Sequence, residues 1–381
     1  MKHNYILLLL PAILWSCSGK PLNVKIVGSD ASQLMIVDEA KVSDTRDIRL
    51  SDIASDFRVV RFDNREEALF RPGMLSFSDN YIIAGKEPVK LFDRDGRYIC
   101  DVGAIGNGPG EYPIGAYDVL IDEEGGQIYV AGFNNKINSY DLQGNFTGEA
   151  KIGRKLNKGK LFKNADATIS TVQLCFSEQD DNQFVAATFP TSMNDTDTVS
   201  YVFSPYLVAN LVDDTGATVG FNNEIFSYRC TDTPTFHTTF NDTLYNYNAE
   251  ANRLEAVYTL DMDIERKDGA FFVYYDLPHH MLTYIVGGAN KGKIMVDKST
   301  REAWRVGKCI NDFFFNLDGW GWSMHDGYVY GIYEPLELKS RLEDAIADGK
   351  IGSEHHEAVE RFMTTLHEND NNVMIVAKLR S

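Results

Sequence analysis

Residues 89–96 read Val89-Lys90-Leu91-Phe92-Asp93-Arg94-Asp95-Gly96. An apolar run of this kind predicts a β-strand, and the aspartate at its end can cap a tight turn with its carboxylate. A glycine three residues later can adopt the positive φ that closes such a turn. The stretch therefore predicts a strand that ends in a hairpin.

The same strand-turn unit recurs along the chain. Copies lie at residues 137–144, 210–216 and 294–300, with a degenerate one at 244–248. The turn aspartates of the first two copies, Asp93 and Asp141, lie 48 residues apart. A repeat of about 40 to 50 residues that holds several short strands is typical of the blades of a β-propeller. The sequence therefore predicts an all-β ring, and its length admits six or seven blades.

One segment near the C-terminus departs from the β pattern. In residues 335–367, Leu338, Leu342 and Ala345 fall on one face of a helix. The segment therefore predicts a small helical insertion. The apolar run that follows, residues 373–377, predicts a last strand that completes a blade begun near the start of the domain and so closes the ring.

The N-terminus has the pattern of an export signal. Lys2 precedes an apolar run at residues 5–15, which is too short to span a bilayer of about 30 Å. The segment Leu14-Trp15-Ser16-Cys17 resembles a bacterial lipobox, and the resemblance implies cleavage before Cys17 and acylation of that cysteine. An ordinary secretory signal with a chance cysteine is the alternative. We assign residues 1–16 to a signal peptide, 17–49 to a lipidated tether and lead-in, and 50–381 to the propeller.

The same N-terminal segment predicts where in the cell the protein is located. Acyl chains on Cys17 would hold the protein to a membrane. The stretch after Cys17 has no acidic cluster of the kind that some lipoproteins carry for surface export. We therefore expect a cell-envelope protein at the outer membrane that faces the periplasm, with display on the cell surface as the alternative.

Charge and cysteine content exclude some classes of function. The chain has 55 acidic and 37 basic residues and a formal charge of -18, which disfavours binding to nucleic acid. A local basic run at residues 151–163 is predicted to be a solvated loop. Four cysteines are scattered without a CxxC pair, and the sequence leaves their disulfide status open. They are Cys100, Cys175, Cys230 and Cys309.

Residues 89–153 resemble NHL-type propeller repeats. The likeness lies in the first strand and turn, the Gly108-Pro109-Gly110-Glu111-Tyr112 loop and the strands around them. More broadly the chain resembles the bacterial six-bladed β-propeller lipoproteins, a largely uncharacterised family, through its 50–54 segment and its closing 368–373 segment. The resemblance implies six blades, and it implies no catalytic residue and no cofactor.

Several motifs suggest chemistry but lack the context it needs. The glycine-rich stretch at residues 103–110 is broken by proline and followed by a strand, whereas a phosphate loop must begin a helix. Residues 321–325 are close to a nucleophile elbow, yet a turn and a strand follow them instead of a helix. The pairs at 279–280 and 355–356 are adjacent histidines, not the i, i+4 pair of a metal helix. We expect no catalytic residue and no metal site from local motifs.

The aromatic stretch at residues 313–322 offers the best candidates for binding. Trp320, Trp322 and His325 could present rings to a sugar or peptide ligand at one face of the propeller. The alternative is that these rings pack between blades. The sequence thus predicts a non-enzymatic envelope lipoprotein whose propeller face binds a protein, peptide or glycan. The rival is a propeller enzyme of the lactonase or lyase type with a divalent metal on its axis. A structural subunit of an envelope assembly is a third possibility.

Overall fold

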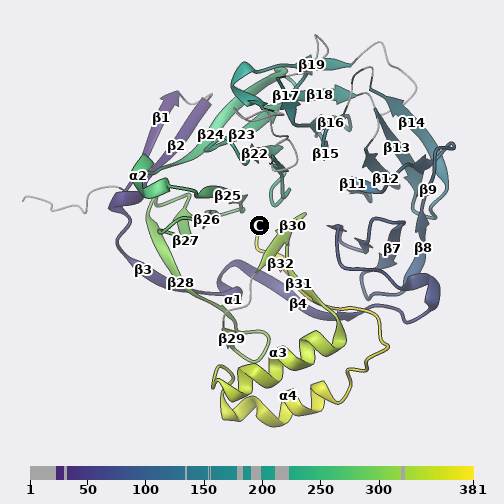
Figure 1. Cartoon of the computed structure of the whole chain (residues 1–381), viewed down its shortest axis with the longest axis vertical. Helices are drawn as coiled ribbons and strands as arrows, with labels where there is room; N and C mark the ends of the chain where they lie inside the picture. The colour runs from purple at the N-terminus through teal and green to yellow at the C-terminus, as the bar shows by residue number, and fades with distance from the viewer. Residues whose placement is uncertain are drawn as a thin grey trace, which may run out of the picture.

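The computed structural model describes residues 23–29, 32–133, 135–152, 154, 156–177, 183–189, 199–210, 223–318 and 322–381. Its strands form six radial sheets, or blades, around a common axis (Figure 1). In each blade the strands run antiparallel from an innermost strand beside the axis to an outer one. The predicted six-bladed all-β propeller is confirmed.

Each blade is built from four main strands. They carry numbers in chain order and are given below from the axis outward. Blade 1 has β30 (Ser323–His325), β31 (Tyr328–Tyr333), β32 (Val373–Leu379) and β4 (Ala54–Arg61). Blade 2 has β5 (Leu75–Phe77), β6 (Tyr81–Ala84), β7 (Val89–Asp93) and β8 (Tyr98–Val102). Blade 3 has β11 (Ala116–Asp122), β12 (Gln127–Gly132), β13 (Lys136–Asp141) and β14 (Phe146–Lys151).

The second half of the ring follows the same plan. Blade 4 has β15 (Lys160–Lys163), β16 (Ile169–Val172), β18 (Ala186–Phe189) and β19 (Ser200–Val202). Blade 5 has β21 (Ile225–Phe226), β22 (Thr235–Thr238), β23 (Thr243–Asn248) and β24 (Arg253–Asp261). Blade 6 has β25 (Phe271–Asp276), β26 (His280–Val286), β27 (Gly292–Asp297) and β28 (Ala303–Asn311). Short strands in the connections are β9 (Ala104–Ile105), β10 (Glu111–Tyr112), β17 (Cys175–Phe176), β20 (Val208–Ala209) and β29 (Leu317–Asp318).

The ring closes by a strand from the far end of the chain. The last strand, β32, pairs with β31 on one side and with β4 on the other, so one blade unites both ends of the domain. Just before it, the buried side chain of Asn371 donates hydrogen bonds to the carbonyls of Asp63 and Ala68, each at 2.9 Å. The predicted closing strand is therefore present, and it removes the free edge that an open sheet would leave.

The described part of the N-terminal lead-in runs along the outside of two blades. β2 (Ser32–Asp38) pairs with β1 (Val24–Ser29) and runs parallel to the outer strand β24 of blade 5. β3 (Thr45–Arg49) then runs parallel to the outer strand β28 of blade 6. The chain thus extends two sheets before it enters blade 1 through α1 (Leu50–Ile53).

The repeated aspartates cap the outer hairpins as predicted. Asp93 Oδ1 accepts from the amides of Asp95 and Arg97, and Asp141 and Asp297 accept from their own turns in the same way. Gly96 has a φ of 89°, and a Cβ there would lie 2.6 Å from the carbonyl oxygen of Arg61 in blade 1. The turn glycine therefore also lets a hairpin pack against the outer strand of the preceding blade. Most of the copy at residues 210–216 lies outside the described residues.

The predicted helical insertion lies between β31 and β32. It consists of α3 (Pro335–Ala347) and α4 (His356–Met363), which lie beside blade 1 (Figure 1). Leu338, Leu342 and Val359 are buried and pack against side chains of β31, β32 and β4 in that blade. The short helix α2 (Ile264–Lys267) lies in the connection between blades 5 and 6. No helix in the described part of the chain has both the length and the hydrophobicity needed to cross a membrane.

The hydrophobic core is divided into seven clusters. Six of them each lie between two neighbouring blades, and the seventh joins the helices to blade 1. Phe92, for example, is fully buried between blades 1 and 2, where it packs edge-on against Phe62. Because no layer of hydrophobic side chains passes through the centre of the ring, the burial of such side chains between neighbouring blades holds the blades together.

Two faces of the ring follow from the strand order. Antiparallel neighbours alternate in direction, so all six innermost strands begin on the same face. We call this the loop face, because it carries the connections between blades and those between the second and third strands of each blade. The opposite face carries the first-to-second and third-to-fourth hairpins, and we call it the hairpin face.

Candidate functional site

The axis of the ring is crossed by the side chain of Arg229. This residue follows β21, in a segment that continues along the axis beyond the end of that strand. Its Nη1 donates to Asp118 Oδ2 in blade 3 at 2.7 Å, and its Nε donates to Asp326 Oδ1 in blade 1 at 2.6 Å. The same guanidinium donates to the carbonyls of Leu161 in blade 4 and Val119 in blade 3. One cation thus ties blade 5 to three others.

The remaining blades join the same network. Asp326 also accepts from the hydroxyl of Ser76 at 2.6 Å and from an amide of blade 2. Next to Arg229, the ring of Tyr228 stacks on Tyr275 of blade 6 with centroids 4.1 Å apart. All six blades therefore contribute to this network, which we call the axial tie and define as residues 227–231 together with Asp118 and Asp326.

The ionisable groups of the axial tie are buried together, and each shifts the pKa of the others. Burial alone would raise the pKa of Asp326, but the Arg229 guanidinium and the His325 ring outweigh it and hold that pKa well below its usual range. Burial alone would lower the pKa of Arg229, but Asp118 and Asp326 raise it. Both groups therefore stay ionised near neutral pH, and each is the counter-charge of the other.

Local chemistry explains why the chain adopts these positions. Asp326 and Gly327 form the turn between β30 and β31 with φ of 48° and 76°, which is the Asp-Gly pattern of a tight hairpin. Arg229 has a φ of 46°, a region that costs a residue with a side chain about 1 kcal/mol or more. The ion pairs of Arg229 hold it in that conformation.

A second group of polar side chains lies nearer the loop face, where the innermost strands begin. Lys160 is the first residue of β15, and its ammonium lies 4.6 Å from the ring centroid of Tyr117 in β11. The Tyr117 hydroxyl donates to Glu224 Oε2 at 2.5 Å, and Lys158 forms an ion pair with the same carboxylate. The exposed ring of Phe133 packs edge-on against Tyr117. We call these five residues the axial mouth.

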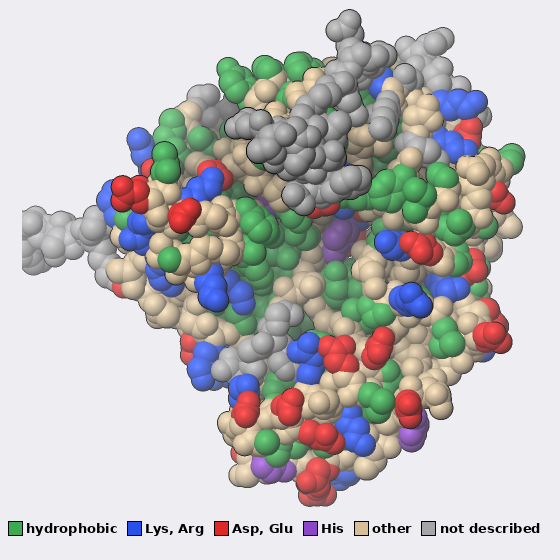
Figure 2. Space-filling model, viewed as in Figure 1, with side chains coloured by type: hydrophobic (Ala, Val, Ile, Leu, Met, Phe, Trp, Pro, Cys, Tyr) green, Lys and Arg blue, Asp and Glu red, His purple; other side chains and the backbone are tan. Residues whose placement is uncertain are grey.

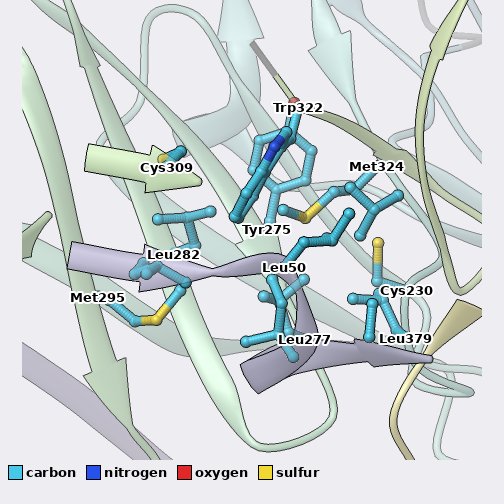
Figure 3. Close-up of a cluster of buried hydrophobic side chains, with 14 of the residues drawn as sticks. Leu50, Cys230, Tyr275, Leu277, Leu282, Met295, Cys309, Trp322, Met324 and Leu379 are labelled. Atoms are coloured by element: carbon cyan, nitrogen blue, oxygen red, sulfur yellow. The ribbon is translucent and has the colours of Figure 1, made fainter. Parts of the chain in front are cut away.

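The residues predicted from the aromatic stretch are separated by the fold. Trp322 is buried among Tyr275, Met324 and Leu50 in the core between blades 6 and 1 (Figure 3). His325 lies at the end of β30, with its Nδ1 2.9 Å from Asp326 Oδ2. Trp320 lies outside the described residues, as does Cys17. The structure thus brings His325 to the axial tie and Trp322 into the core, and their role in binding a ligand stays a prediction.

The prediction of a solvated basic loop at residues 151–163 was wrong for its second half. Lys160 and Lys163 begin and end a strand of the inner ring, and Lys163 is paired with the buried Asp122. The signal was present in the sequence, because these two lysines enclose the apolar pair Leu161-Phe162. Arg229 had no such signal, since its partners come from strands that lie about 100 residues away in either direction.

A metal-dependent propeller enzyme would hold its metal on the axis. Within the described ranges, no group of three or more histidine, cysteine, aspartate or glutamate side chains could hold one. The two axial carboxylates nearest the centre, Asp118 and Asp326, accept hydrogen bonds from Arg229 instead. Ser323 of the elbow-like motif is an exposed residue of a strand, with a hairpin after it.

Most of the exposed large apolar side chains lie in the connections of the loop face. Of the fourteen large hydrophobic residues that are exposed in the described part, eleven lie in loop-face connections or at their ends. They are Leu69, Ile105, Ile114, Phe133, Phe203, Tyr206, Phe240, Ile264, Val286, Phe313 and Leu336. The other three lie on outer strands, and of these Phe146 begins β14 at the end of a hairpin-face turn. Figure 2 shows one face of the ring, with hydrophobic side chains around the hollow at its centre.

Comparison with solved structures finds proteins of similar fold at low sequence identity. A protein described as "Putative exported protein" from Bacteroides fragilis has a TM-score of 0.59 at 12% identity, with 89% of this chain and 98% of that one covered. A member of the DUF4221 family from Bacteroides vulgatus has a TM-score of 0.47 at 11% identity, with 86% and 98% covered. A search of the curated proteins found no match.

A family model gives the firmer relationship. It is described as "Domain of unknown function (DUF4934)" and matches residues 34–378, which span the ring, the lead-in strands β2 and β3 and the helical insertion. The match covers far more than half of the sequence. The chain therefore belongs to the DUF4934 family.

Proposed function

We propose that this protein is a non-enzymatic binding protein of the cell envelope, and that it binds a protein partner through its loop face. The observation that carries the proposal is the distribution of exposed large apolar side chains, of which eleven of fourteen lie in the connections of that face or at their ends. Large exposed apolar surfaces often mark the sites at which proteins bind a partner. Aromatic residues in particular are enriched in the cores of protein–protein interfaces.

The geometry of the axis supports binding more than catalysis. The buried charges of the axial tie are paired with one another across the blades, so they serve the stability of the ring. A catalytic group instead needs a pKa near the working pH and room for a substrate. The loop face, in contrast, collects connections from every blade and gives a broad surface for a partner.

We further propose that the protein is held at the outer membrane through lipid on Cys17 and faces the periplasm. The lipobox-like segment supports this, as does the fold shared with a protein described as exported. We also propose, from the motifs at residues 89–153, that the blades are related to NHL-type repeats. Metabolic labelling with a palmitate analogue tests the anchor: label should enter the wild type and be absent from Cys17→Ser, and an unlabelled wild type would contradict it.

Site-specific photo-crosslinking in the native cells tests the binding face. Tyr206 in a loop-face connection is 81% exposed, and Glu124 in the hairpin between β11 and β12, on the opposite face, has a side chain that is 94% exposed. A photoreactive phenylalanine at position 206 should give discrete crosslinked species, and the same group at position 124 should not. Crosslinks from position 124 alone, or none from position 206, would overturn the proposed binding face.

A further inference from the structure

Lys160 at the axial mouth differs from the two lysines that flank it in the sequence. Lys158 pairs with Glu224 and also donates to the carbonyl of Asn223 at 2.7 Å, and Lys163 pairs with Asp122 at 2.6 Å. Among the residues that the structure describes, the ammonium of Lys160 forms no ion pair and no hydrogen bond with any side chain or carbonyl. Its ammonium packs over the face of the Tyr117 ring, while Asp118 and Glu224 attract it and Arg229 and Lys158 repel it without direct contact.

The carboxylates closest to Lys160 are committed to other donors. Glu224 accepts from the Tyr117 hydroxyl and from Lys158. Asp118 Oδ2 accepts from the amide of Leu161 at 2.7 Å and from Arg229 at 2.7 Å. Both anions are therefore satisfied without Lys160, and the axial mouth retains one ammonium with three unused donors.

An unpaired ammonium beside the axis is costly unless something supplies its missing partner. Removal from water destabilises the charged form, and burial accordingly lowers the pKa of Lys160. The contact with Tyr117 offsets a part of that cost, because a cation over an aromatic face is attracted to it. A carboxylate from outside would offset much more, since a charge-assisted hydrogen bond in a poorly solvated place is strong.

We propose that the axial mouth binds a carboxylate of an acidic side chain on the partner protein, with Lys160 as its counter-ion. The inference rests on the proposed function, because it names the chemical group that the loop face receives at its centre. Lys160 is only partly exposed, so the acidic side chain must enter beside Tyr117 and Phe133. The exposed apolar residues around the mouth would then contact the rest of the partner.

Nuclear magnetic resonance of the lysine side-chain nitrogens tests this on the intact mature protein. The probe is acetyl-glutamate-amide, and its matched control is acetyl-glutamine-amide at the same ionic strength. The glutamate probe should shift the Lys160 signal saturably, with an affinity in about the millimolar range, and should raise its pKa. The glutamine probe should leave that signal unchanged. The Lys160→Arg variant lacks the Lys160 signal and so identifies it in the spectrum of the wild type. Because arginine keeps the positive charge, this variant is suitable even if variants without the charge fold poorly.

Two further comparisons make the outcome decisive. Lys86, on the same face, is exposed and lies beside Glu87, so Lys86→Gln should leave the response of Lys160 intact. A Lys160 signal that does not respond to the glutamate probe would overturn the inference, as would a response to glucuronate alone, which would point to an acidic glycan. Crosslinks at position 206 without any carboxylate response would overturn the carboxylate site and leave the proposed binding face standing. A carboxylate response without crosslinks would support the carboxylate site and overturn the proposed binding face.

Discussion

Arg229 Nε and Asp326 Oδ1 lie 2.6 Å apart on the axis of the ring, although 97 residues separate them in the chain. Both side chains are buried, with 7% and 9% of their surface exposed. The pair joins blade 5 to blade 1, and through Asp118 and Leu161 the same guanidinium reaches blades 3 and 4. A propeller has no central core layer, so this network takes the place of one.

Arg229→Met should strongly destabilise the protein. The substitution leaves Asp118 and Asp326 buried without their cation, and breaking a buried ion pair from one side costs about 3–5 kcal/mol. Chemical denaturation measures the change in the free energy of unfolding. The control is Arg253→Gln, whose ion pair with Glu255 is exposed on the arginine side and should cost less than about 1 kcal/mol. Equal losses in the two variants would contradict a structural role for the axial tie.

His237 should make the folded state sensitive to mild acid. It is fully buried between Phe226 and Tyr274, and burial lowers its pKa to about 3. The unfolded chain takes up a proton near its ordinary pKa of about 6.5, while the folded chain does not, so stability falls as the pH drops from there towards 3. Most carboxylates titrate below about pH 5, which leaves the upper part of that window to His237 and to His280, whose pKa burial also lowers.

The variant His237→Phe separates this effect from the rest. Phenylalanine keeps the ring contacts but removes the titrating group, and it leaves the Tyr274 amide without its acceptor. Overall stability should therefore fall, while the loss between pH 7 and pH 5 should become smaller than in the wild type. Denaturation midpoints at several pH values measure the slope. An unchanged slope would mean that His237 is already free to take up a proton in the folded state.

Asn371→Ala should weaken the closure of the ring. The side-chain amide holds the segment before β32 to the carbonyls of Asp63 and Ala68, and both would lose their donor. Buried acceptors that lose a partner cost about 1–3 kcal/mol. Asn80, an exposed asparagine whose amide bonds Glu123 at the hairpin face, is the control and should change stability by less than about 0.5 kcal/mol when replaced by alanine. Hydrogen exchange in β32 and β4 should rise together in Asn371→Ala, since the two strands share one ladder.

How far the sequence predicts this molecule depends on the range of the interactions concerned. The strands, the Asp-turn-Gly hairpins and the helical insertion depend on residues a few positions apart, so their patterns are visible in the chain. Blade number needed a family resemblance, because repeat spacing alone admitted six or seven. The sites depend on contacts between distant strands. Arg229 meets Asp118 and Asp326 only after the ring has closed, and the burial of Trp322 depends on Tyr275 and Leu50. Nothing local distinguishes such residues from their neighbours.

The turn glycines offer a test of why the repeat keeps its form. Gly144 ends the unit at residues 137–144 with a φ of 81°, and a Cβ there would lie 2.5 Å from the carbonyl oxygen of Asp101 in blade 2. Gly126, in the hairpin between β11 and β12, has a φ of 64°, but a Cβ there would meet nothing within 4 Å. Both alanine variants share the cost of a left-handed backbone, about 1–2 kcal/mol. Gly144→Ala alone should also push blade 3 away from blade 2, so its free energy of unfolding should fall further than that of Gly126→Ala. If the two variants lose the same stability, the glycine of the repeat serves only the turn and has no part in packing the blades.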